Sequence, residues 1–155
     1  MKWERMVLIA FLGNYLVNNI AAGLASLVPS AQGGNPMLSG QYITFVILAA
    51  ITTGLIAWWY LMKMSSSDGL MKGLIFGAVG FVVAVVTAFV TGVAGVLLQT
   101  GSIAQVGSVL PNFGPYLFQW TTLVLLLVWV LPSVFVGYLM QMRMGRPAPM
   151  PMETM

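Results

Sequence analysis

The chain has 155 residues, of which 59% are hydrophobic and only 6% are charged. Soluble domains carry roughly 25% charged residues, so this composition excludes an ordinary water-soluble domain. Six basic residues against three acidic ones give a net charge of +3, and their scatter along the chain excludes a nucleic-acid-binding patch.

The charged residues lie in three short segments, which leave the stretches 6–62 and 73–142 without any charge. A segment that contains Gly and Pro interrupts each stretch near its middle, and each stretch is long enough for two membrane crossings of about 20 residues. The apolar runs lack the period of two that β-barrel strands show. We therefore predict an all-α integral membrane protein, a four-transmembrane-helix bundle. Its predicted spans are about 5–28, 41–62, 69–98 and 115–142.

The first span carries small and polar residues at every fourth position, which lie along one face of a helix. This row consists of Ala10, Asn14, Asn18, Ala22 and Ser26. An amide in hydrocarbon costs free energy unless it is hydrogen-bonded, so we expect Asn14 and Asn18 to point into the bundle. Two interpretations stay open: the amides hold helices together, or they line a polar path. The first is the commoner role of polar residues inside membrane helices.

The second and third spans are joined by a short basic connection, in which Ser65 to Asp68 supply residues that favour a helix N-terminus. Thr52 and Thr53 in the second span can bond their own backbone, or they can join the amides in a polar path. The third span carries a stripe of small residues, which lets another helix approach closely. That stripe consists of Gly73, Gly77, Gly80, Ala84, Ala88 and Gly92, and we expect it to contact the first span.

The fourth span is apolar on every side from Leu123 to Leu131, and we expect this segment to face lipid. Pro132 removes a backbone hydrogen bond, so we expect a kink near Val128. Trp129 lies in the middle of the span, far from the interfaces at which Trp usually settles. The last residues, 144–155, are rich in Pro and Met and predict an extended tail after the four-span domain 1–143.

All six basic residues fall on one side of this arrangement. The positive-inside rule then places both termini and the 63–72 connection in the cytoplasm. The chain contains no glycosylation sequon and no organelle signal, so we expect a multi-pass protein of the bacterial inner membrane.

Short strings recur in the two halves of the chain. Tyr60-Leu61-Met62 ends the second span and Tyr138-Leu139-Met140 ends the fourth, while Gly40-Gln41-Tyr42 and Gly114-Pro115-Tyr116 open these spans. One interpretation is a duplicated two-helix hairpin with an axis along the membrane normal. The alternative is chance, because membrane chains use few residue types and Tyr favours both interfaces.

Apart from Arg5 and Lys72 near their starts, the predicted spans contain no Asp, Glu, Lys, Arg or His, which pumps and proton-coupled transporters usually place there. General acid–base catalysis also needs a titratable group in a pocket, so we expect no enzyme activity. Without Cys or His we expect no metal site, and Met150, Met152 and Met155 make a weak case for copper. We expect no ligated cofactor, although a lipid, a quinone or a carotenoid held by shape remains compatible with the composition.

Two functions fit this sequence. The first is helix association, as an accessory or assembly subunit of a larger membrane complex or as a homo-oligomer, with membrane lipid and other membrane subunits as partners. The second is a small channel or facilitator for a neutral solute or ion, lined by Asn14, Asn18 and the threonines Thr52 and Thr53.

Overall fold

The computed structural model describes residues 3–29, 39–63, 68–102, 107 and 119–144. The described residues form four long α-helices, each apolar enough to cross a membrane, which confirms the all-helical fold expected from the sequence. These helices are α1 (Trp3–Ala25), α2 (Gly40–Leu61), α3 (Gly69–Thr100) and α5 (Trp120–Met144). The Pro- and Met-rich tail and the string Gly114-Pro115-Tyr116 lie outside the described residues.

The helix bounds differ from the predicted spans mainly in the first and the last helix of the chain, α1 and α5. α1 ends at Ala25 rather than at residue 28, and the chain then turns through Ser26 and Leu27. α5 begins at Trp120 rather than at residue 115. α2 begins after Ser39, whose hydroxyl accepts a hydrogen bond of 3.2 Å from the backbone N–H of Tyr42. This is the capping geometry that satisfies a free N–H at a helix start.

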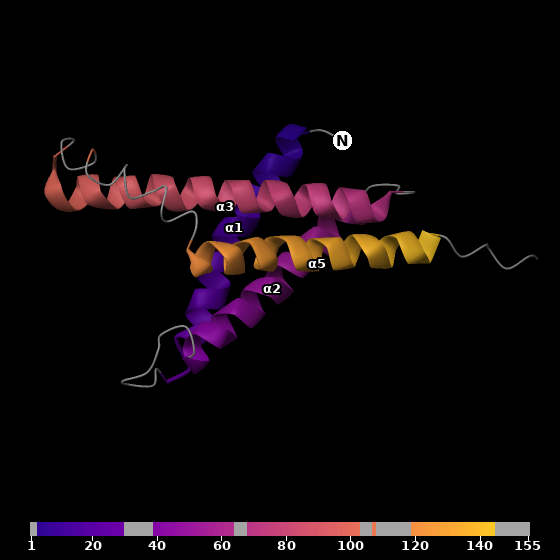
Figure 1. The fold of residues 1–155 in the computed structure, drawn as a ribbon, viewed down its shortest axis with the longest axis horizontal. Coiled ribbons are helices and arrows are strands. Elements are labelled where there is room, and N and C mark those ends of the chain that lie inside the picture. Colours follow the sequence, from indigo (N-terminus) through magenta and orange to yellow (C-terminus); the bar gives the residue numbers. More distant parts are fainter. Residues whose placement is uncertain (1–2, 30–38, 64–67, 103–106, 108–118, 145–155) are drawn as a thin grey trace, which may run out of the picture.

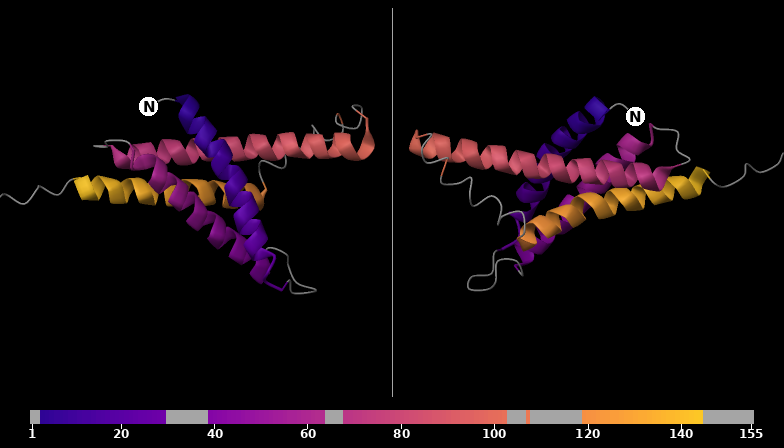
Figure 2. Two further views of the ribbon diagram at one scale, coloured as in Figure 1. Left: turned by 180° about the vertical axis from the view of Figure 1, so that it is seen from behind. Right: turned by 45° about the horizontal axis from the view of Figure 1, so that its top comes forward.

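The helices form two antiparallel pairs that cross each other obliquely (Figures 1 and 2). α3 and α5 run side by side and share the most extensive interface, while α1 and α2 pass across them and also contact each other. The start of α1, the end of α2, the start of α3 and the end of α5 lie at one end of the bundle, where the charged residues are. We call this the basic end and the opposite one the uncharged end.

Glycines on α3 bring α5 into close contact. A Cβ added at Gly77 would lie 2.8 Å from the Cα of Val130, and Gly69 and Gly73 lie directly against the backbone of α5 near Gly137. We expected the first span to occupy this stripe, and α1 does contact α3, but the glycines face α5. Two backbones approach this closely only where both helices carry small residues, as α5 does at Ser133 and Gly137.

Trp129 does not face lipid, contrary to our expectation for the segment from Leu123 to Leu131. Its side chain is 0% exposed and Val128 is also buried, whereas Leu123, Leu127 and Leu131 are exposed. The indole lies on Gly80 of α3, where a Cβ would collide with the ring. The missing side chain therefore creates the space that the large residue fills. α5 continues through Pro132 as one helix.

Packing along α3 is uneven. Its buried residues all lie between Gly69 and Ala84, whereas Ala88 and Gly92 are exposed. A Cβ added at Gly92 or Gly95 would meet nothing within 4 Å. Within the described chain, the small residues Gly92 and Gly95 of α3 therefore have no close neighbour on another helix.

Candidate functional site

Charged and aromatic side chains pair at the basic end. The Nζ of Lys63 lies 3.9 Å from the ring centroid of Trp59, and the guanidinium carbon of Arg143 lies 5.1 Å from that of Trp58. Such cation–π contacts let a basic residue stay in the interface beside an indole. The amide side chain of Gln141 accepts a 3.3 Å hydrogen bond from the backbone N–H of Leu70, which joins the end of α5 to the start of α3.

Large side chains fill the half of the bundle next to the basic end. The rings of Tyr60 and Phe76 stack with centroids 5.0 Å apart, and Phe76 and Trp129 are 6.5 Å apart. Met6 from α1 and Met140 from α5 complete this buried cluster. All four helices contribute to it, so it holds the two pairs of helices together.

The half toward the uncharged end contains a cavity of about 460 Å³, which we call the polar cavity. All four helices line it, and its walls are mostly apolar and aromatic. The polar side chains among its lining residues are Asn14, Tyr15, Asn18, Tyr42, Thr87, Thr91 and Thr121. None of its lining residues is charged.

The two asparagines in the polar cavity bond to each other. The Nδ2 of Asn18 donates to the Oδ1 of Asn14 over 3.3 Å, and Asn14 is only 3% exposed. This bond leaves the two N–H groups of Asn14 and the carbonyl oxygen of Asn18, for which no bond to another described residue is found. A second polar molecule can therefore find both donors and an acceptor on this pair.

The threonines of the polar cavity differ in whether their hydroxyl groups can still donate a hydrogen bond. Thr87 and Thr91 donate to the carbonyl oxygens of Val83 and Thr87, at 2.7 and 2.8 Å, as is usual for threonine inside a helix. They keep only acceptor capacity. The buried hydroxyl of Thr121 has no hydrogen-bond partner among the described residues, and so it remains a potential donor.

The residues that we expected to form the row on α1 do not share one environment. Ala10 and Asn14 are buried, whereas Asn18, Ala22 and Ser26 are exposed. The buried face instead continues through Val17, Ala21 and Ala25. Asn18 still lines the polar cavity, and the hydroxyl of Ser26 donates to the carbonyl oxygen of Gly23 over 2.6 Å.

Thr52 and Thr53 lie away from the polar cavity. Thr52 donates to the carbonyl oxygen of Leu48 over 2.8 Å and lines a separate cleft between α1 and α2, and Thr53 is fully buried. Sequence reasoning did not assign Thr87, Thr91 and Thr121 to a polar path. Thr87 and Thr91 bond their own backbone as Thr52 does, and Thr121 lies at the start of its helix, so only the helix arrangement assigns the three to the cavity.

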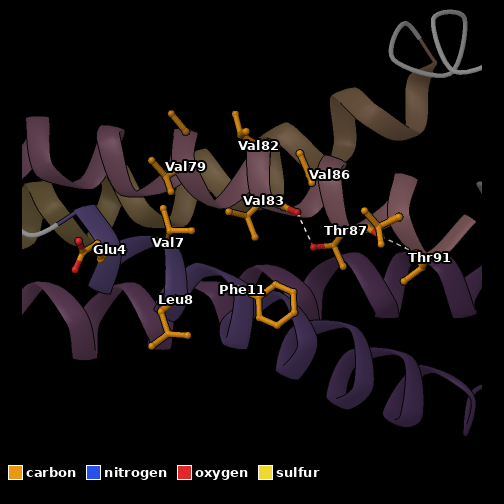
Figure 3. A pocket seen from close by; sticks show the side chains of 12 residues that line it. Glu4, Val7, Leu8, Phe11, Val79, Val82, Val83, Val86, Thr87 and Thr91 are labelled. Atoms are coloured by element: carbon orange, nitrogen blue, oxygen red, sulfur yellow. Dashed lines mark hydrogen bonds between the residues drawn. The ribbon is translucent and has the colours of Figure 1, made fainter. Parts of the chain in front are cut away.

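An apolar groove of about 900 Å³ runs between α1 and α3, and Figure 3 shows its lining. Val7, Leu8 and Phe11 from α1 face a row of valines on α3 across it. The valines are Val79, Val82, Val83, Val86 and Val90. Glu4 is the one charged residue of its lining, at the basic end of α1.

The apolar groove and the polar cavity are adjacent, because Phe11, Thr87 and Thr91 line both of them. Along α1, the residues from Glu4 to Phe11 border the groove, and those from Phe11 to Asn18 border the cavity. On α3 both spaces reach Thr91, so the groove lies beside the cavity and extends further toward the basic end.

The described residues contain no cluster of His, Asp or Glu that could hold a metal ion. Comparisons of the chain with protein-family models, with curated proteins and with solved structures found no significant match. The functional assignment therefore depends on the residues and the geometry of this chain.

Proposed function

We propose that this chain is a small polytopic membrane protein that works by helix association. It acts as an accessory or assembly subunit of a larger membrane complex, or as a homo-oligomer. The observation that supports this proposal is the uneven packing of α3, in which no buried residue follows Ala84 and no described residue lies close to Gly92 or Gly95.

The length of α3 makes this exposure significant. Its 32 residues extend about 48 Å at 1.5 Å per residue, against about 30 Å of hydrocarbon in a bilayer. The glycine contact with α5 uses only the first half of the helix. The second half keeps Gly92 and Gly95, at which a further helix could approach closely. Small residues are typical of helix–helix contacts in membranes, so their presence here favours contact with another helix over contact with lipid.

We further propose that both termini are cytoplasmic and that the membrane is the bacterial inner membrane. Arg5, Lys63, Lys72 and Arg143 all belong to the basic end, which supports this orientation by the positive-inside rule. A duplicated hairpin also remains a proposal. The two antiparallel pairs of helices are compatible with it, although the close glycine contact of α3 with α5 is tighter than the α1–α2 contact at Gly13.

Native mass spectrometry of the protein, purified from its own membrane in a mild detergent, tests the association. We expect a complex with a second subunit or with further copies, and we expect Gly92→Leu to dissociate it, because the added side chain separates the two helices. Gly23→Leu on α1 is the matched control, since Gly23 is also open and exposed. A lone wild-type monomer would contradict the proposal, and so would equal dissociation by both variants.

A second candidate function is a small channel or facilitator for a neutral solute. The observation that favours it is the polar cavity, in which Asn14 and Asn18 both lie. Solute flux into liposomes tests it: a facilitator of this kind loses flux in Asn14→Leu and keeps it in Asn19→Leu. The filled half around Trp129 weighs against a path through one copy, so the first proposal is the stronger one.

A further inference from the structure

We infer that the polar cavity and the apolar groove together form a binding site for one neutral, single-tailed lipid. The lipid has a small uncharged head that carries carbonyl or hydroxyl oxygens, and a long hydrocarbon tail. The head lies in the cavity and the tail lies in the groove. This inference does not rest on the proposed association, because its hydrogen-bonding groups belong to Asn14, Asn18 and Thr121 and not to Gly92 or Gly95.

The absence of charge in the polar cavity selects a neutral head. The cavity is lined without a single Asp, Glu, Lys or Arg, and residues of all four helices surround it. A phosphate or carboxylate head would enter without a counter-ion, and burying an unpaired charge is costly. An uncharged head avoids this cost.

The free hydrogen-bonding groups match oxygen atoms on such a head. The N–H groups of Asn14 and the hydroxyl of Thr121 are available as donors, and the carbonyl oxygen of Asn18 is available as an acceptor. A carbonyl oxygen can accept from the first two groups, and a hydroxyl can in addition donate to the third. Buried polar groups are normally paired, and a polar occupant would supply the partner that the buried hydroxyl of Thr121 lacks.

The remaining walls of the cavity suit the body of the head. Phe11, Phe45 and Tyr42 line it together with valines from α1, α2 and α5. Ligand pockets in proteins combine apolar and aromatic walls with a few placed polar groups, and this cavity has that composition. Its volume of about 460 Å³ is also within the ordinary range for such pockets.

The groove supplies the place for a tail. It adjoins the cavity at Phe11, Thr87 and Thr91, and it is lined on α3 mostly by valines. Figure 3 shows Val83 and Thr87 on one side of this space and Phe11 on the other. A hydrocarbon chain attached to the head can therefore leave the cavity without crossing a polar surface. The packed cluster around Trp129 occupies the neighbouring half of the bundle, so the site retains its ligand rather than passing it through.

A photoreactive monoacylglycerol with a diazirine in its acyl chain provides the test, with the full-length protein in phosphatidylcholine vesicles. We expect saturable labelling of the peptides around Phe11 and Val83. Two lipid classes carry the proposed chemistry, so unlabelled monoacylglycerol and a decyl-substituted benzoquinone serve as competitors. The stronger competitor identifies the class, and competition by neither would overturn the inference.

Matched variants distinguish labelling at a specific binding site from general labelling of the lipid-exposed surface. We expect Asn14→Leu to lower the apparent affinity about tenfold, because it removes hydrogen bonds to a desolvated head. Asn19→Leu should leave the affinity within about twofold, since Asn19 is exposed and donates to the carbonyl oxygen of Tyr15. Ala88→Phe should also abolish saturable labelling, because the added ring fills part of the cavity. This variant replaces Asn14→Leu in the test if Asn14→Leu fails to fold.

The result that would overturn the inference is equally definite. Labelling that does not saturate, or that is equal in Asn14→Leu and Asn19→Leu and is retained in Ala88→Phe, means that ordinary bilayer lipid fills the groove. Equal labelling by a photoreactive lysophosphatidylglycerol, which has one tail and an anionic head, would exclude the selection of a neutral head.

Discussion

At the scale of single residues, the same residue type has different roles according to its neighbours. Trp120 at the start of α5 is 61% exposed, whereas Trp129 on the same helix is 0% exposed. The difference comes from α3, where Gly80 leaves room for the indole of Trp129. Asn14 and Asn19 differ in the same way, because one faces the polar cavity and the other faces outward.

Trp129→Ala should lower the free energy of unfolding by about 3–5 kcal/mol, the usual loss for deleting a buried aromatic side chain. Trp120→Ala, with an exposed ring, should change it by less than about 1 kcal/mol. Equilibrium unfolding in mixed micelles measures both variants. An equal loss in the two variants would show that the ring of Trp129 is not the centre of the packed half.

At the scale of helices, the small residues of α3 divide into two groups. Gly69, Gly73, Gly77 and Gly80 touch α5, whereas no described residue lies within 4 Å of a Cβ added at Gly92 or Gly95. The first group stabilises the monomer, because backbone contact increases the number of dispersion contacts between the two helices. The second group is free for contact with another chain, as we propose.

Gly77→Leu should disrupt the monomer itself, because its Cβ would lie 2.8 Å from the Cα of Val130 and 2.9 Å from the carbonyl oxygen of Trp129. We expect a loss of about 1–3 kcal/mol or more from overpacking. Gly95→Leu, at an open position on the same helix, should leave the unfolding free energy of the isolated monomer unchanged. A larger loss of unfolding free energy in Gly95→Leu than in Gly77→Leu would show that α3 and α5 do not make contact at Gly77.

The sequence predicted the helices better than their partners. Charge-free length and the breaks at Gly and Pro are local signals, and they located α2 and α3 closely. The partner of a glycine stripe depends on the other helix, and Gly137 on α5 was not recognised as the counterpart of Gly73. The polar cavity was anticipated only through Asn14 and Asn18, because Thr121 reaches it only once α5 is packed against α2 and α3.

At the scale of the whole molecule, the bundle has a packed half and an open half. The packed half adjoins the basic end and contains Tyr60, Phe76 and Trp129. The open half contains the polar cavity and the free part of α3. In the proposed orientation, the structure that holds the fold lies toward the cytoplasm, and the surfaces left for other molecules lie toward the opposite side.

Single cysteines test this orientation cleanly, because the chain contains no native Cys. A cysteine at Lys63, next to the end of α2, should react with a membrane-impermeant maleimide only in inverted vesicles. A cysteine at Ser102, just after α3, should react only in right-side-out vesicles. The opposite pattern would reverse the proposed topology.

The central claim is that another helix covers the free half of α3 in the native membrane. A spin label on a cysteine at Gly92 measures this directly, through the accessibility of the label to oxygen dissolved in the lipid. We predict that position 92 is shielded in native membranes relative to a label at Gly23, and that dilution into detergent removes the shielding. A label at position 92 that is as accessible as the one at position 23 in native membranes would contradict the claim.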